Sequence, residues 1–321
     1  MDALRDTATQ STAASESGYG IAVDLRDGSV VVTGMFDGSV NFGGGPIAPG
    51  SGQNLFLVKL ASADGSNLWS RTLKSSANTV GNAVAVDASG GIFMIGSVMT
   101  FNGLNSTIDF GAGAVTPVGN EMFLAKYTST GGYVWARHFG TSVSGSALAL
   151  DPAGNVVVTG KYQNSVNFGG TTLTNAPSSL FLVPANIYVA KFSGASGAYV
   201  WSKGYGGVRD DGGVGIAVGP SGNITVTGYV NSSVDFGGGV LNPAVLGSYA
   251  FVANLATDGC HRWSRIYGAG FTSGGAVAIG PDGDSHIVGS FRNTVDFGGA
   301  PITPPLVPAG RTDMFLLELG P

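Results

Sequence analysis

Side chains that could carry out acid–base, nucleophilic or metal chemistry are few in this chain. His138, His261 and His286 fall at unrelated points of the sequence pattern described below, so we expect surface or turn histidines. Cys260 precedes His261 in a turn, where adjacent side chains tend to point apart, so no thiolate–imidazolium pair is expected. No serine sits in a Gly-x-Ser-x-Gly elbow followed by an acid and a histidine. We therefore predict no catalytic residues, no metal site and no cofactor.

Aspartates at one recurring position are the remaining candidates for catalysis. Asp24, Asp87 and Asp151 each end a predicted strand, and Gly219 and Gly280 take this position later in the chain. Glycoside hydrolysis needs carboxyl groups whose pKa values differ, so three acids around a channel would suggest a glycoside-processing enzyme. Aspartate is also a common turn residue, because its side chain accepts backbone hydrogen bonds. We favour the turn role.

Three other residue types recur without pointing to catalysis. Asparagine and aspartate exchange freely before a Phe-Gly pair, which indicates hydrogen bonding to a turn rather than a calcium site. The recurring tryptophans could stack on sugars, but their fixed sequence context favours packing between repeats. A recurring lysine is later replaced by Asn254 and Glu318 and is expected on the surface. The residues in question are Asn41, Asp109, Asn167, Asp235 and Asp296; Trp69, Trp135, Trp201 and Trp263; and Lys59, Lys126 and Lys191.

The elements that would position these residues follow from an internal repeat. The tryptophans are separated by 66, 66 and 62 residues, and the Asx-Phe-Gly string and the glycine that closes Val-Thr-Gly recur in step with them. The first four repeats each contain four predicted strands, A to D, such as 19–24, 29–36 and 55–60 followed by the tryptophan strand. A strand-filled repeat of this length is typical of one propeller blade. We predict an all-β, five-bladed β-propeller with blades at about 18–73, 81–140, 145–205, 213–268 and 274–319.

Closure of the predicted ring involves the N-terminus. The last repeat stops after strand C, and residues 3–10 precede the first strand A by about the usual D-to-A distance. We therefore expect residues 3–10 to form the outer strand of the last blade, so that 1–321 is one complete domain with no exposed radial edge.

The repeat resembles the bacterial SBBP, or β-propeller repeat, family. The resemblance lies in the Val-Asp-Pro-Ala-Gly-Asn-Val-Val-Val-Thr-Gly run that ends at Gly160, in the following Ser-Val-Asn-Phe-Gly-Gly, in Phe56-Leu57-Val58-Lys59-Leu60 and in Trp69-Ser70-Arg71. It implies a propeller in extracellular or cell-surface proteins of bacteria and supplies no catalytic residues. The family's name implies seven blades, whereas this chain has five repeats.

Composition narrows the partners. Glycine contributes 54 of 321 residues, only 11% of residues are charged, and the net charge is −5 without a Lys/Arg cluster. Nucleic acid is therefore not expected as a partner, and no apolar run is long enough for membrane insertion. The N-terminus lacks an export signal, so we expect either an intracellular protein or, as the family resemblance implies, a mature extracellular or cell-surface one. A monomer is the simplest expectation.

The loops suggest where binding would occur. In an antiparallel blade the B–C and D–A connections share one end, which we call the loop face, and here they are long and divergent. We predict a non-catalytic module that recognises an extracellular glycan or protein through this face. The alternatives are a structural or protein-interaction scaffold without a small ligand and the glycoside-processing enzyme. The candidate contact residues are Leu180, Phe181, Leu246, Tyr249, Arg209, Asp210 and Asp211.

Overall fold

The computed structural model describes residues 15–50, 52–100, 106–175, 183–268, 270–304 and 312–321. These residues form strands and turns without a helix, which confirms the prediction of an all-β chain. The chain divides into two compact units, residues 1–145 and 146–321, which are described one at a time. The predicted outer strand at 3–10 and the candidates Leu180 and Phe181 lie outside the described residues.

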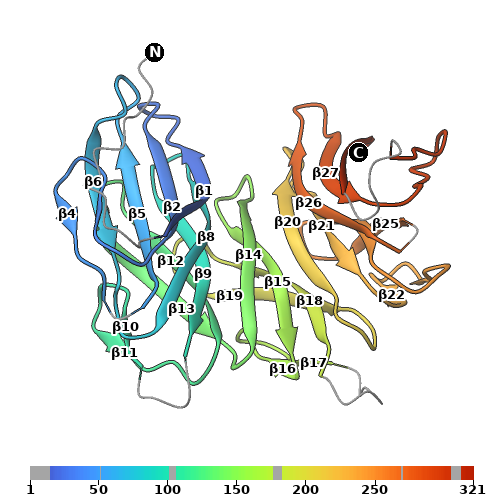
Figure 1. Cartoon of the computed structure of the whole chain (residues 1–321), viewed down its shortest axis with the longest axis horizontal. Coiled ribbons are helices and arrows are strands. Elements are labelled where there is room, and N and C mark those ends of the chain that lie inside the picture. Colours follow the sequence, from blue (N-terminus) through green and yellow to red (C-terminus); the bar gives the residue numbers. More distant parts are fainter. Residues whose placement is uncertain (1–14, 51, 101–105, 176–182, 269, 305–311) are drawn as a thin grey trace. The chain divides into compact units, whose positions relative to one another are not determined.

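The first unit contains two four-stranded sheets in which strands adjacent in sequence are also adjacent in space (Figure 1). This meander is the arrangement expected of a propeller blade. The strands are β1 (Glu16–Val23), β2 (Val30–Phe36), β5 (Asn54–Leu60) and β6 (Asn67–Thr72) in the first sheet, and β8 (Asn78–Val86), β9 (Ile92–Met99), β12 (Glu121–Tyr127) and β13 (Tyr133–Phe139) in the second.

The second unit repeats the meander twice and then adds a sheet of three strands. That last sheet ends at strand C, and no fourth strand pairs with it among the described residues. The strands are β14 (Val143–Leu150, which begins at the end of the first unit), β15 (Val156–Gln163), β18 (Ala185–Phe192) and β19 (Tyr199–Tyr205); β20 (Gly212–Val218), β21 (Ile224–Val230), β24 (Tyr249–Leu255) and β25 (His261–Tyr267); and β26 (Thr272–Ile279), β27 (Ser285–Phe291) and β28 (Asp313–Leu319).

Each B–C connection begins with the same small hairpin. At its turn the recurring Asn or Asp side chain accepts a hydrogen bond from the amide of the glycine two residues later, which confirms the predicted turn role. The prediction that these connections are unlike one another is therefore wrong for their first halves. The hairpins are β3 (Val40–Asn41) with β4 (Pro46–Ile47), β10 (Ile108–Asp109) with β11 (Ala114–Val115), β16 (Ser165–Val166) with β17 (Leu173–Thr174), and β22 (Val234–Asp235) with β23 (Val240–Leu241), and a bridge joins Val295 to Ile302; β7 (Lys74–Ser75) also pairs with β10.

The sequence markers of the repeat contact one another inside each blade. A Cβ atom on Gly96 of strand B would stand 2.0 Å from the Val80 carbonyl oxygen and 2.6 Å from Cζ of Phe123 on strand C. The phenylalanine of the hairpin, Phe110, lies against the same ring with 5.3 Å between the ring centroids. The marker glycine is thus required because strand A and an aromatic ring approach it closely. The same neighbours surround Gly34, Gly228 and Gly289.

Within each unit, a sheet packs its strand A against strands B and C of the preceding sheet. In the second unit, Ile216 of β20 belongs to one buried cluster with Ile187 and Val189 of β18. Close backbone approach accompanies this packing, because a Cβ on Gly274 of β26 would stand 2.0 Å from Oγ1 of Thr227 in β21. Apolar burial of this kind contributes about 25 cal/mol per Å², so these junctions are a main source of stability.

Two of the tryptophans also contact the neighbouring sheet, as predicted. The Trp69 indole donates to the carbonyl of Ser129 in the next C–D turn at 3.1 Å, and Trp201 donates to Thr257 in the same way at 3.1 Å. Trp135 is buried beside Phe93 of its own sheet. Buried indoles usually need such a partner for their N–H.

Two sheet faces lack the cover that their equivalents have. Ile21 of β1 is 71% exposed, whereas Val84, at the same place in β8, is 7% exposed. Met314 and Leu316 of β28 are 76% and 71% exposed, whereas their equivalents in strands C of the four other sheets are buried. Those equivalents are Leu55, Leu57, Met122, Leu124, Ile187, Val189, Ala250 and Val252.

Candidate functional site

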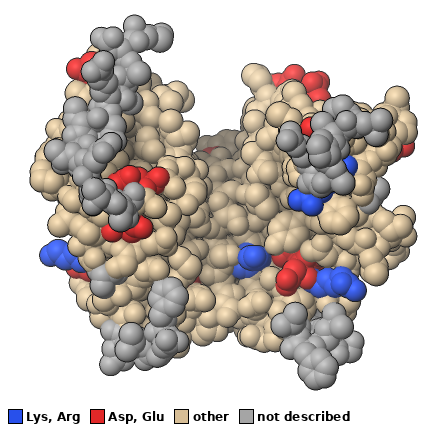
Figure 2. Space-filling view, viewed as in Figure 1, with Lys and Arg blue, Asp and Glu red and all other residues tan. Residues whose placement is uncertain are grey.

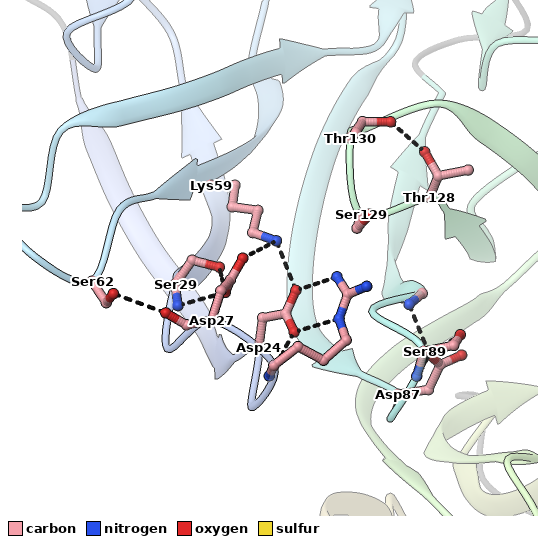
Figure 3. A network of polar contacts seen from close by, with 12 residues as sticks. Asp24, Asp27, Ser29, Lys59, Ser62, Asp87, Ser89, Thr128, Ser129 and Thr130 are labelled. Carbon is pink, nitrogen blue, oxygen red and sulfur yellow. Dashed lines mark hydrogen bonds and ion pairs between the residues drawn. The ribbon is translucent and has the colours of Figure 1, made fainter.

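The recurring aspartates lie where strand A ends and the A–B turn begins. Asp24 is fully buried and accepts hydrogen bonds from Nε and Nη2 of Arg26, at 2.9 and 2.7 Å, and from Nζ of Lys59 at 2.7 Å (Figure 3). Lys59 also lies 3.6 Å from the Asp27 carboxylate. All three charged partners of this network come from the same sheet, so the carboxylate holds its own turn against its own strand C.

The other two aspartates repeat the arrangement. Asp87 accepts the amides of Ser89 and Gly91 and lies 3.1 Å from Nζ of Lys126. Asp151 accepts the amide of Asn155 at 2.8 Å and lies 2.7 Å from Nζ of Lys191. Each aspartate therefore bonds within its own A–B turn, which confirms the predicted turn role.

The charge state of these acids does not suit glycoside hydrolysis. The Arg26 hydrogen bond holds the pKa of Asp24 well below its usual range, against the effect of burial. Burial alone would raise the pKa of Asp87 and Asp151, but it is outweighed by Ser89, Gly91 and Lys126 at Asp87, and by Lys191 and Asn155 at Asp151, so both pKa values are lowered. A general acid needs a raised pKa, and none of the three provides one.

The expectation that the recurring lysines lie on the blade surface is wrong. Lys59 and Lys191 are buried, and Lys126 is largely so, because each ammonium pairs with the carboxylate of its own sheet. The sequence contains a signal for this pairing: the two blades that have Gly219 and Gly280 in place of aspartate also lack the lysine. Aspartate and lysine are lost together.

The histidines and the cysteine form no shared site. His138 pairs with the buried Glu121, with 2.5 Å between Nδ1 and Oε2, while His261 contacts Ser264 and His286 lies 3.7 Å from Glu318. Across the described ranges, no group of three or more His, Cys, Asp or Glu side chains could hold a metal ion. A hydrogen bond with Asp258 raises the pKa of the exposed Cys260 thiol, which disfavours the reactive thiolate.

The candidate residues of the loop face divide into exposed and buried ones. Leu246 is 80% exposed, and Arg209 and Asp210 are exposed too. Tyr249 and Asp211 are buried, so neither can contact a glycan or protein bound at the surface. Tyr249 instead accepts the Val245 amide at its hydroxyl.

An apolar surface lies beside Leu246. The B–C loop that carries Val245 and Leu246 meets the D–A segment before β26, where the Ser248 amide donates to the Gly270 carbonyl at 3.0 Å. Phe271, which follows, is 57% exposed, and the Arg292 guanidinium lies 5.7 Å from its ring centroid. We call Val245, Leu246, Phe271 and Arg292 the loop-face patch. Figure 2 shows few charged residues on one face of the molecule. The patch itself consists of three apolar residues and one arginine, so it would bind mainly through apolar and aromatic contact.

A hollow of about 470 Å³ lies at the opposite end of the second unit's sheets. It is lined by the ends of three successive strands A and the prolines that follow them, including Asp151, Pro152, Pro220 and Pro281. Asp151 is the one charged residue in this lining, and its carboxylate already pairs with Lys191 and Asn155. The other lining residues are aliphatic residues, glycines and prolines.

No helix in the described part of the chain is long and apolar enough to cross a bilayer. No family model matches the chain, so the resemblance to the β-propeller repeat family stays a prediction.

Similarity to known proteins is partial. The regulatory protein FlaEY of Caulobacter vibrioides is 27% identical over 239 residues, which are 73% of this chain and 24% of that protein. The chain thus spans about a quarter of the length of this relative. Among solved structures, the Dos1 propeller is 12% identical with a TM-score of 0.41, over 84% of this chain and 65% of that one. A gluconolactonase of Xanthomonas campestris is 12% identical with a TM-score of 0.38, over 86% and 84%. The chain is thus similar in part to FlaEY and, remotely, to these solved structures.

Proposed function

We propose that this chain is a non-catalytic binding module that recognises an extracellular glycan or protein through its loop face. The observation that carries the proposal is the loop-face patch, where Leu246 and Phe271 are exposed on loops held by a rigid sheet. Exposed apolar groups that adjoin one another on such loops are common at recognition sites. The carboxylates of Asp24, Asp87 and Asp151, at the other end of the blades, are each paired with a lysine of the same sheet. This favours a binding function over a catalytic one.

We further propose that the five blades form one closed ring. The exposed aliphatic faces of β1 and β28 match the two kinds of face that join neighbouring sheets inside each unit, where strand A of one sheet covers strand C of another. Residues 3–10 would supply the missing strand D of the last blade. Closure would place the five sets of B–C and D–A loops on one face.

A glycan-array screen of the purified chain, with and without calcium, tests the binding proposal. The matched variants are Leu246→Ser with Phe271→Ser in the patch and Leu25→Ser, another exposed leucine, in an A–B turn. We expect one sugar class to bind the wild type and the Leu25 variant and to lose at least about tenfold in affinity for the patch variant. Equal binding by all three proteins would show that the patch is not the site.

A protein ligand is the second candidate, and the partial identity to a protein named as regulatory favours it. A clean negative on the array followed by patch-dependent capture of one identified protein partner would support it. In either case we propose an extracellular or cell-surface monomer.

A further inference from the structure

A fully buried carboxylate lies at the loop end of the second unit, between the β14–β19 sheet and the β20–β25 sheet. Asp211 precedes β20, and its Oδ2 and Oδ1 atoms accept the amides of Gly207 and Asn231, both at 2.8 Å. No Lys, Arg or His forms an ion pair with it among the contacts of the described residues. Buried charges are normally paired or bound to a metal, because the loss of water is otherwise costly.

Other oxygen atoms without partners surround the same place. Asn186 is nearly fully buried, and its Oδ1 has no hydrogen-bond partner; the same is true of Ser232 Oγ. The point where a Cβ of Gly206 would stand lies 2.6 Å from Asn186 Oδ1 and 2.9 Å from Asp211 Oδ2. The corresponding point of Gly207 lies 2.3 Å from Ser232 Oγ. Two side-chain oxygens therefore face one point beside Gly206, and a third lies beside the neighbouring Gly207.

The β8–β13 sheet of the first unit offers a comparison. Glu121 holds the place of Asn186 there, and its buried charge is matched by His138, which stands opposite Phe123 on strand D. In the second unit, the residue opposite Tyr188 at that place is Gly204, which has no side chain. The nearest group to a Cβ there would be another oxygen, the Tyr162 hydroxyl, at 2.7 Å. The buried Asp211 carboxylate thus has oxygen neighbours, whereas the buried Glu121 carboxylate is paired with an imidazole.

We propose that Asp211, Asn186 and Ser232 form a calcium site at this junction. Carboxylate, amide and hydroxyl oxygens without nitrogen or sulfur are the ligands that Ca²⁺ prefers, and Ca²⁺ tolerates irregular coordination. The ion fixes the β19–β20 loop, which contains Gly206 and Gly207, against the loop after β21 that contains Ser232. With one buried carboxylate and the exposed Asp210 beside it, the site belongs to the weak class, with a Kd on the order of 10⁻⁴ to 10⁻³ M.

The test measures the Tm of the full chain in EDTA, in about 10 mM CaCl₂ and in about 10 mM MgCl₂, with calorimetric titration of CaCl₂ alone. Asp211→Thr is the informative variant, since Thr79 and Thr272 hold this place in other blades and the fold tolerates it. Asp235→Asn is the matched control, because Asn41 and Asn167 occupy its equivalents. We expect calcium to raise the Tm of the wild type and the control by about 3–10 °C and to leave Asp211→Thr unchanged.

Three results would overturn the site: no calcium-dependent shift in the wild type, an equal shift with magnesium, or a shift that survives in Asp211→Thr. A proton rather than an ion would be assigned if the wild type, but not Asp211→Thr, lost stability as the pH rose through about 7, regardless of calcium. None of these measurements involves a glycan or protein ligand, so their outcome is independent of the proposed function.

Discussion

Removing Lys191 while Asp151 stays in place should destabilise the second unit strongly. The two side chains are buried, their charged atoms are 2.7 Å apart, and Lys191 also donates to the carbonyl and hydroxyl of Thr257. Loss of one partner of a buried pair costs about 3–5 kcal/mol, because the other charge remains without water. For Lys191→Asn this corresponds to a rise in the unfolding equilibrium constant of roughly two to four orders of magnitude.

The next blade shows which second substitution should compensate for the loss of Lys191. The next blade holds Gly219 and Asn254 at the places of Asp151 and Lys191 and folds without an ion pair. The double variant Asp151→Gly with Lys191→Asn should therefore recover to within about 1 kcal/mol of the wild type, since replacing both partners of a buried pair is often neutral.

Urea unfolding followed by tryptophan fluorescence of the wild type, both single variants and the double variant gives the coupling energy. The pKa of Asp151 is lowered in the folded state, so its contribution is present above its unfolded pKa of 3.8 and is lost as the pH falls through the lower folded value. That acid-side loss should disappear in the double variant. A double variant as unstable as Lys191→Asn alone would refute the reasoning.

Two further predictions concern single residues. The hydrogen bond that the His138 imidazole donates to the Glu121 carboxylate raises the pKa of His138. The stability that this pair contributes is therefore present below the unfolded pKa of 6.5 and is lost as the pH rises through the folded value. A pH titration of the Tm should show this loss in the wild type and not in His138→Gln. Gly228→Ala should lower the free energy of unfolding in urea by at least about 3 kcal/mol or prevent folding, because its Cβ would stand 2.0 Å from the Gly212 carbonyl oxygen. Gly299→Ala should change the free energy of unfolding by less than about 0.5 kcal/mol, because no atom lies within 4 Å of the added Cβ. Equal effects of the two alanines would contradict this account of the marker glycines.

Much of the fold could be predicted from the sequence because the same residue pattern recurs in each blade. The tryptophan, the marker glycine and the Asx-Phe-Gly string each occupy one place in every blade where they occur, and Phe110, Phe123 and Gly96 show why: they touch one another. A contact that recurs in each repeat leaves a trace at a fixed spacing, so the strands and the A–B turns followed from it.

Features made by a single blade were harder to predict. The place of Asp211 is also buried in the blades where Thr79 and Thr272 hold it, so the repeat could have indicated its burial. Its unpaired carboxylate could not be predicted in this way, because only this blade has an aspartate at that place. The apolar contribution of Phe271 to the loop-face patch was missed because the residue stands just before a strand A, at a place where the other blades have no aromatic residue. The Asp–Lys pairs, by contrast, could have been found by comparing which residues are lost together.

The loop face exists as one surface only if the blades close into a ring, and methionine oxidation measures this closure directly. Met314 and Met122 occupy equivalent places, opposite Ser290 and Ser97, yet Met314 is 76% exposed and Met122 is fully buried. The full monomeric chain would be treated with dilute peroxide, and sulfoxide at each methionine quantified by mass spectrometry. Closure predicts that Met314 is oxidised as slowly as Met122, because the β1 face covers it. Oxidation of Met314 at the rate of an exposed methionine, while Met122 stays protected, would contradict the closed ring.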